Sequence, residues 1–217
     1  GTILWTHNGA GSITAGATTL TPTYTAAAGD AGTIVTLTMT VSNAPCAAAT
    51  ATYSVDVRTT PTASAGGSQT ICQTGAYTLV GGEATAPIGT ILWTHNGAGS
   101  ITAGATTLLP TYTAAAGDAG NTVTLTITVS NAPCADAVAT YSVIVMGSPT
   151  ASAGGTQNIC QGGAAVVSGA SSANGTILWT EDGLGSITAG ATTLTPTYTS
   201  VAGDAGNTVT LTMTVSN

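Results

Sequence analysis

Apolar and polar residues alternate one by one along several short segments of this chain. The clearest segment, TVTLTITVSN at residues 122–131, places Val123, Leu125, Ile127 and Val129 between threonines. Successive side chains of a β-strand point to opposite faces of a sheet, so this alternation predicts a strand with one face in the core and the other in water. No segment shows the period of about 3.6 residues that an amphipathic helix requires. The pattern predicts an all-β protein.

Other segments extend this prediction to a set of short strands. ATYSVIV at residues 139–145 alternates in the same way, with Tyr141, Val143 and Val145 inward. The polar turn NAPCAD that precedes it predicts a hairpin with residues 122–131. Glycine and Asn-Gly punctuation bounds three further predicted strands, at residues 76–82, 90–96 and 106–113.

A long internal repeat organises the chain. Residues 1–57 return as residues 89–145 with seven differences, and a third copy begins at Thr176, 86 residues after Thr90. Each repeat therefore holds about seven short strands in roughly 90 residues, which is typical of an immunoglobulin-like β-sandwich.

The repeat also predicts the division into domains. One complete sandwich is expected at residues 60–146, preceded in 1–59 by the later strands of one unit and followed in 147–217 by the earlier strands of another. The stretch PTASAGG, at residues 61–67 and 149–155, marks the passage between units. Sandwiches joined by so short a linker are expected to form an extended rod, and we expect the chain to be a segment of a longer array.

Charge narrows the range of partners. Only 4% of the residues are charged, Arg58 is the single lysine or arginine, and the formal net charge is −7. Binding to nucleic acid or to an anionic lipid surface depends on lysine and arginine, so neither partner is expected. A hydrophobic fraction of 43% argues against disorder, and no apolar run approaches the roughly 18 residues that cross a bilayer. We expect a folded chain without direct membrane insertion.

Candidate catalytic residues are scarce. The two histidines, His7 and His95, occupy the same position of the repeat, and the third copy has Glu181 there. A general base or a metal ligand requires one particular side chain, so this drift predicts a solvated surface position. No histidine recurs beside a nucleophile or a pair of carboxylates, which argues against an enzyme, and no cofactor is expected.

One aspartate recurs in every copy within the sequence AGDAG, as Asp30, Asp118 and Asp204. These residues are weak candidates for calcium ligands, because Ca²⁺ takes about six to eight oxygens and each turn offers one carboxylate. The alternative, which we favour, is that each aspartate caps or bonds the backbone of its own glycine-containing turn.

The three tryptophans, Trp5, Trp93 and Trp179, each follow Ile-Leu on a predicted strand. A tryptophan in such a sandwich is more often a core anchor, which we favour over a role in stacking on a sugar. An array of carbohydrate-binding modules is the alternative function, with the variable segments 81–89 and 169–175 as its best candidate surfaces.

Four cysteines recur along the repeat, Cys46 and Cys134 in NAPC and Cys72 and Cys160 in ICQ. Regular spacing predicts disulfides in an oxidising compartment, and zinc is disfavoured because the tight C-x-x-C spacing is absent. One possible bond joins Cys72 to Cys134 within the complete unit. The other, which we favour, joins adjacent repeats, because an Ig-like strand order places the two turns at opposite ends of a sandwich.

Two stretches of the sequence resemble known types of repeat. TYTAAAGDAGNTVTLTITVSN at residues 111–131, followed by ATYSV, resembles the closing strands of PKD-like and related Ig-like repeats. PTASAGGSQTIC at residues 61–72, with NAPC later, is similar to repeats of giant surface adhesins of Bacteroidota, including gliding-motility adhesins exported by type IX secretion. The resemblance covers the whole chain. PKD domains have an acidic glycine motif after the tryptophan, where this chain has Thr-His-Asn-Gly at residues 94–97, so no ligand role is carried over.

The resemblance implies an extracellular stalk on the surface of a bacterium. We therefore expect structural repeats of a large secreted adhesin that supports adhesion or gliding. Neighbouring repeats of the same chain are the expected partners, with surface glycans or other copies of the filament as further ones. The near identity of the copies favours this function over the carbohydrate-binding array.

Overall fold

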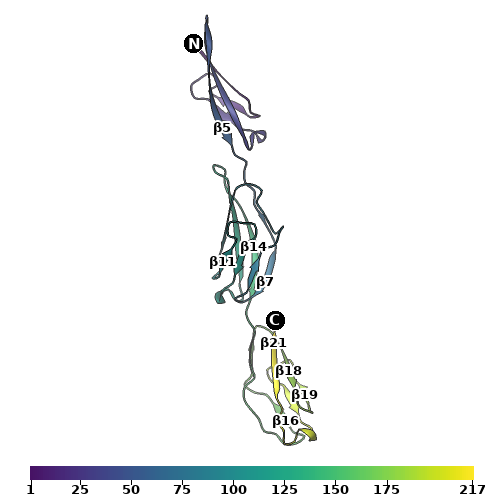
Figure 1. Cartoon of the computed structure of the whole chain (residues 1–217). Coiled ribbons are helices and arrows are strands. Elements are labelled where there is room, and N and C mark those ends of the chain that lie inside the picture. The colour runs from purple at the N-terminus through teal and green to yellow at the C-terminus, as the bar shows by residue number, and fades with distance from the viewer.

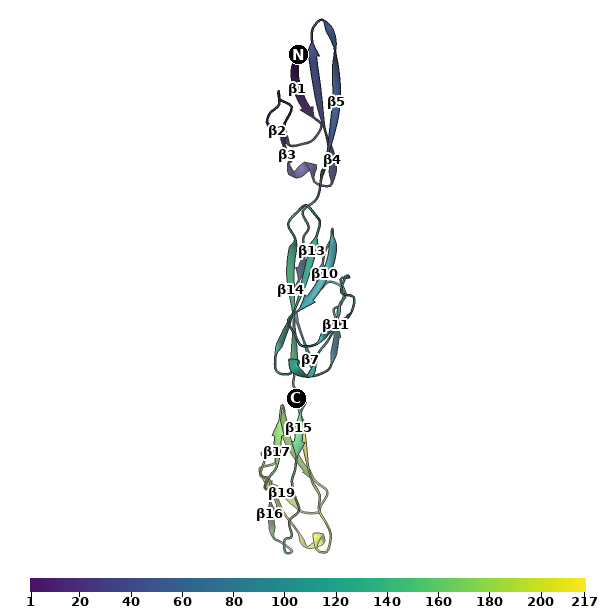
Figure 2. The same cartoon turned by 90° about the vertical axis from the view of Figure 1, so that its left-hand side faces the viewer.

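The computed structural model describes residues 1–217 as three groups of β-strands, here called units 1, 2 and 3, that follow one another along a line (Figures 1 and 2). Every sheet lies within one unit, and residues 58–63 and 147–149 connect the units. Helical structure is limited to a three-residue 3₁₀ turn in each unit, and none of it is long and apolar enough to cross a membrane. The predicted all-β rod is confirmed.

Unit 2 contains the fullest set of strands. They are β6 (Ser64–Ala65), β7 (Ser68–Cys72), β8 (Ala76–Thr78), β9 (Ala84–Thr85), β10 (Thr90–His95), β11 (Ser100–Ala103), β12 (Thr111–Thr113), β13 (Thr122–Ser130) and β14 (Ala137–Met146), with η2 (Ala116–Asp118) before β13. One sheet has the order β10-β13-β14-β7, a second has the order β11-β12-β8, and β6 pairs with β9. β7 joins β14 in parallel, whereas β13 is antiparallel to both of its neighbours. This arrangement is an immunoglobulin-like β-sandwich.

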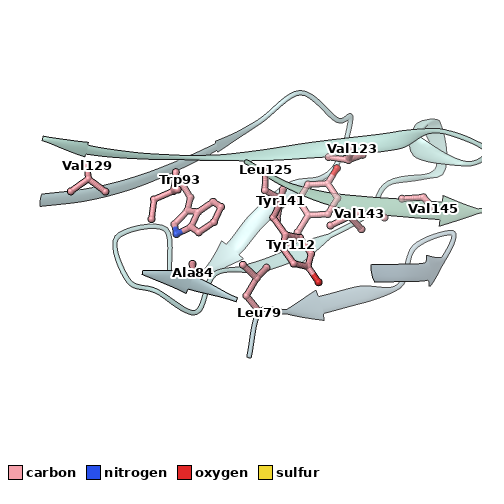
Figure 3. Packing of buried hydrophobic residues seen from close by; sticks show 12 residues of the cluster. Leu79, Ala84, Trp93, Tyr112, Val123, Leu125, Val129, Tyr141, Val143 and Val145 are labelled. Carbon is pink, nitrogen blue, oxygen red and sulfur yellow. The ribbon is translucent and has the colours of Figure 1, made fainter. Parts of the chain in front are cut away.

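The core of unit 2 lies between these sheets (Figure 3). The alternate residues of β13 and β14 that the sequence predicts to face inward are all buried: Val123, Leu125, Ile127, Val129, Tyr141, Val143 and Val145. Leu79 and Tyr112 pack against them from the β11-β12-β8 side, and Trp93 of β10 lies beside them, with its indole directed toward Ala84. The period-two pattern therefore predicted both the strands and their buried faces correctly.

Two predicted strands are too long. In residues 106–113 only β12 is extended, because the Thr107 N–H donates to the Gly104 carbonyl in a turn. Gly104 has a φ of +68° in this turn, and its unit 1 counterpart Gly16 has +69°. A left-handed φ of this kind favours glycine and interrupts a strand. In residues 76–82 the strand β8 already ends at Thr78.

Unit 1 contains counterparts of the later strands only. They are β1 (Thr2–His7), β2 (Ser12–Ala15), β3 (Thr23–Thr25), β4 (Thr33–Asn43) and β5 (Cys46–Val57), with η1 (Ala28–Asp30) before β4. Its main sheet has the order β1-β4-β5, so one edge of β5 is unpaired. Tyr53 of β5 is 65% exposed, whereas its counterpart Tyr141 in unit 2 is 1% exposed.

Unit 3 contains counterparts of the earlier strands and no counterpart of β14. Its strands are β15 (Thr150–Ser152), β16 (Ala164–Val166), β17 (Ser171–Ala173), β18 (Thr176–Glu181), β19 (Ser186–Ala189), β20 (Thr197–Thr199) and β21 (Leu211–Ser216), with η3 (Ala202–Asp204) before β21. Residues 156–160, which correspond to β7, form no strand. The domain boundaries after residues 59 and 146 stay a prediction, and the three units are defined by their strands alone.

Candidate functional site

Each unit contains the same cluster of hydrogen bonds around its recurrent aspartate. In unit 2, Asp118 ends η2 and is 3% exposed. Its Oδ1 accepts a hydrogen bond from the Ala98 N–H at 2.6 Å. Its Oδ2 accepts from the Gly99 N–H at 3.0 Å, the Ala115 N–H at 2.9 Å and the Tyr112 hydroxyl at 2.8 Å. We call this cluster the aspartate clasp, because it ties the loop after β10 to β12 and η2.

The clasp recurs in units 1 and 3. Asp30 and Asp204 each accept the same four hydrogen bonds from the corresponding donors. The glycines of the loop are required for it, since a Cβ added to Gly97 or Gly99 would lie less than 3 Å from the Tyr112 hydroxyl. The loop can therefore approach the tyrosine only where it carries no side chain.

The clasp gives the calcium candidates a different role. All four partners of each carboxylate are N–H or O–H donors, and their hydrogens occupy the directions from which a cation would have to approach. No group of three or more His, Cys, Asp or Glu side chains could hold a metal ion. Bonding of the aspartate to its own turn, as the sequence favours, accounts for the Ala115 contact alone. The tyrosine was missed, although it precedes the aspartate by six residues in every copy, as Tyr112 precedes Asp118.

Hydrogen bonding and burial shift the pKa values of the clasp. The Tyr24 hydroxyl, followed by backbone N–H groups, lowers the pKa of Asp30 to about 2. Burial favours the neutral form of Asp118, but its four hydrogen bonds outweigh burial and hold the pKa below its usual value. Burial, followed by the bond to Asp118, raises the pKa of Tyr112 to about 12. Each clasp therefore pairs an ionised aspartate with a neutral tyrosine at neutral pH.

We expect the protein to lose stability in acid. An unfolded aspartate has a pKa of about 3.9, so between about pH 5 and pH 2 the unfolded chain binds more protons than the folded one, and the free energy of unfolding falls. Calorimetry across this range should show a falling melting temperature. Neutralisation of the net charge of −7 acts in the opposite direction, because it relieves repulsion between carboxylates. A melting temperature that rises on acidification would contradict the role given to the clasps.

The prediction that the histidines are solvated is wrong. His95 follows Trp93 by two residues on β10, so strand alternation places both side chains on the inner face. The His95 ring packs against Tyr112, with 5.3 Å between ring centroids, and its Nδ1 is buried without a hydrogen-bond partner. His7 is arranged in the same way, and Glu181 is also half-buried at this position of unit 3.

The tryptophans differ in burial although their local sequences match. Trp93 and Trp179 are each 3% exposed, and the indole N–H of Trp93 donates to the Thr107 carbonyl at 2.9 Å. Trp5 makes the corresponding hydrogen bond but is only half-buried, because unit 1 has no counterpart of β8 or β9 to cover it. None of the three indoles is exposed on the surface, where a sugar ring could stack on it.

All four cysteines are unpaired: Cys46, Cys72, Cys134 and Cys160. Cys72 ends β7 level with Met146, at the end of unit 2 that faces unit 3. Cys134 lies in the opposite turn, where its thiol donates to the Arg58 carbonyl at 3.6 Å. The ten residues of β14 separate these ends by about 30 Å, whereas a disulfide needs Cα atoms within about 7 Å. The bond within the unit is excluded, and no disulfide is formed within this chain. The favoured bond between adjacent repeats stays a prediction.

An equivalent hydrogen bond is made at each joint between units. The side-chain amide of Asn131, after β13, donates to the Thr59 carbonyl at 2.8 Å. The amide of Asn217, after β21, donates to the Gly147 carbonyl at 2.9 Å. Both donors and both acceptors occupy equivalent positions of the repeat. This contact was not predicted from the sequence, although the asparagine closes the sequence VSN in every copy.

The two segments suggested for sugar binding are tied into the units. In residues 81–89, Glu83 turns inward and accepts hydrogen bonds from the hydroxyls of Tyr77 and Tyr141 at 2.9 and 2.7 Å. In residues 169–175, the Asn174 side chain donates to the Ser148 carbonyl in the second connecting segment. Neither segment contains an aromatic residue.

No protein-family model and no curated protein matches this chain. Among solved structures, the crystal structure of the protocadherin GammaB4 extracellular domain aligns with 96% of this chain, at a TM-score of 0.38 and 13% sequence identity. The alignment covers 42% of that protein, so this chain spans less than half of its length. The Ig-like fold is assigned from the strand pairings of unit 2, and so loose an alignment carries no functional argument.

Proposed function

We propose that this chain is a stalk segment of a large secreted adhesin on a bacterial surface, in which the main role of each unit is to lengthen the stalk. The observation that carries the proposal is that both joints are built alike: at each junction of the three units in line, an equivalent asparagine donates to the backbone carbonyl at the equivalent position of the connecting segment. Repeats that contact only their neighbours form extended structures. Such a stalk would hold an adhesive part away from the cell and serve in adhesion or gliding.

Two further features support an extracellular stalk. The aspartate clasp recurs in all three units, so the units share the same stabilising hydrogen bonds. Arg58 is the only lysine or arginine, which leaves one site for a trypsin-like protease. That residue lies in a connecting segment and forms an ion pair with Asp56 at 3.1 Å. A chain of this kind suits an environment that contains proteases.

Small-angle scattering tests the rod in solution. β4 has 11 residues, so each unit is about 35 Å long, and three units in line give a radius of gyration of about 30 Å. A compact chain of this length would give about 17 Å. We expect the larger value at low protein concentration, with a maximum dimension above about 100 Å. A radius near 17 Å would contradict the stalk.

The joint asparagine offers a sharper form of this test. Asn131→Ala removes the bond to Thr59 and should loosen the first joint, so we expect a lower maximum dimension and a broader distance distribution. Asn158→Ala is the matched control, because Asn158 is exposed in unit 3 and makes no hydrogen bond across a joint. If both variants scatter alike, the amide does not set the joint.

The carbohydrate-binding array can be tested separately. Binding of the chain to a glycan array would support it, whereas the stalk proposal expects no saturable binding, because the structure offers no exposed aromatic cluster on segments 81–89 and 169–175.

The cysteines enter the proposal as links between units. Cys72 and Cys134 lie at the two ends of unit 2 and face its neighbours, so a bond that either forms must reach another unit. We expect oxidation of this chain to join separate molecules, seen as oligomers on non-reducing electrophoresis that collapse with dithiothreitol. A peptide map that contained Cys72 linked to Cys134 would refute this assignment.

A further inference from the structure

A single segment of chain connects units 2 and 3, and side chains of both units hold it (Figures 1 and 2). We call this connection joint 2 and the one between units 1 and 2 joint 1. The Ser148 N–H donates to Oε1 of Gln73, in unit 2, at 3.2 Å. The Ser148 carbonyl accepts from the side-chain amide of Asn174, in unit 3, at 3.1 Å. The two backbone polar groups of one connecting residue are therefore bonded to different units.

The contact of Asn174 depends on the glycine that precedes Ser148. A Cβ added to Gly147 would lie 2.8 Å from Nδ2 of Asn174, closer than a side chain can approach. The φ of Gly147 lies outside the left-handed region, so its backbone conformation is open to other residues. The reason for a glycine at this place is therefore the space that the amide of Asn174 occupies.

Backbone strain is also concentrated at joint 2. Thr74 and Asn174 are the only residues other than glycine with a left-handed φ, at 62° and 56°. Asn174 donates one bond to Ser148, and Thr74 directly follows Gln73, which accepts the other. A left-handed φ is rare for a β-branched residue such as threonine, and strain of this kind persists only where the surrounding structure fixes it. The turns that carry both bonds to Ser148 are therefore held in definite conformations.

Joint 1 differs from joint 2 at the positions of this glycine and this asparagine. Thr59 is the counterpart of Gly147, and Ile88 is the counterpart of Asn174. Ile88 is 42% exposed, and its side chain has no polar group with which to bond the connecting segment. The other contacts belong to the repeat: an equivalent asparagine bonds both joints, and Gln73 lies in the sequence ICQ, which recurs along the chain. The glycine and the asparagine are thus present together at joint 2 and replaced together at joint 1.

We propose that Asn174 locks joint 2 and that joint 1 is a hinge, so the stalk bends where Thr59 and Ile88 replace the glycine and the asparagine. A single connecting segment can twist and bend. Bonds to Ser148 from both units oppose these motions, because either motion would break a bond and leave a polar group without its partner. This inference rests on the stalk proposed above, and it adds that the stiffness of the stalk varies from joint to joint.

Residual dipolar couplings of the isotopically labelled chain, measured in reducing buffer, test this inference, because they report the degree of order of each unit in an aligned medium. Units 2 and 3 should show equal order, and unit 1 should show less. Asn174→Gly removes the amide and tolerates the left-handed φ, and it should lower the order of unit 3 about twofold relative to unit 2. Gly147→Ala places a Cβ against the amide and should have the same effect, although alanine restricts the backbone more than glycine does.

Ile88→Gly is the matched control at joint 1, because it changes the counterpart of Asn174 and removes no side-chain hydrogen bond. It should leave the order of units 1 and 3 relative to unit 2 unchanged. Amide chemical shifts of β18 and β21 check that unit 3 keeps its fold in each variant. Unchanged order of unit 3 in Gly147→Ala overturns the lock, since a loss in Asn174→Gly alone would come from the flexibility of glycine. Equal order of units 1 and 3 in the unmodified chain overturns the distinction between the joints.

The outcome is separable from the stalk proposal. Small-angle scattering reports whether the three units extend in line, and this result does not depend on which joint is stiffer. An extended chain in which units 1 and 3 are equally ordered would therefore keep the stalk and remove only the lock at joint 2. A compact chain would remove the stalk itself.

Discussion

Replacement of Asp118 by alanine is expected to destabilise unit 2 by about 3–5 kcal/mol, because several donors lose their acceptor at once and each unsatisfied buried donor costs about 1–3 kcal/mol. The carboxylate is 3% exposed and accepts four hydrogen bonds. Small domains are stable by only about 5–15 kcal/mol, so the loss is a large fraction of the total. Hydrogen exchange of peptides that cover β13 measures it in unit 2 alone.

Two variants bracket this result. Asp136→Ala removes an exposed aspartate of the same unit that makes no hydrogen bond, and it should change protection by less than about 0.5 kcal/mol. Tyr112→Phe keeps the buried ring and removes one donor to Asp118, so we expect an intermediate loss of about 1–2 kcal/mol. Equal protection in the Asp118 and Asp136 variants would show that the clasp does not stabilise the fold.

Local patterns predicted those parts of the fold that depend on neighbours in the sequence. The alternation in residues 122–131 located β13 and its buried face, because a strand exposes its two faces in turn whatever packs against them. The same rule, applied to His95, would have placed it inward with Trp93. The drift to Glu181 shows that the position tolerates substitution, and tolerance is a different property from exposure to water.

The candidate site depended on contacts that no local pattern contains. The clasp joins the loop after β10, the tyrosine of β12 and the turn of η2, and 19 residues separate Gly99 from Asp118. Spacing in the repeat could have linked the tyrosine to the aspartate, since six residues separate them in each copy. The opposite position of Cys72 and Cys134 was predictable, because it follows from strand order alone.

Burial of identical sequences depends on which strands cover them. Trp5 and Trp93 lie in the same sequence, GTILWTHNG, and make the same hydrogen bond to a threonine carbonyl. Only Trp93 belongs to a complete core, in which Leu79 and Ala84 lie on the opposite side (Figure 3). How much a residue contributes to the free energy of unfolding therefore depends on the unit in which it lies.

This difference leads to a matched prediction. Trp93→Ala should destabilise unit 2 by about 3–5 kcal/mol, the usual cost of removing a fully buried tryptophan, since the cavity cannot collapse between two sheets. Trp5→Ala should cost unit 1 about 1–2 kcal/mol, because a half-buried indole loses less contact and water can fill the space. Hydrogen exchange of peptides from β13 and from β4 reports the two losses in the same kind of sample. Equal losses would mean that β8 and β9, which unit 1 lacks, contribute nothing to holding the tryptophan of unit 2.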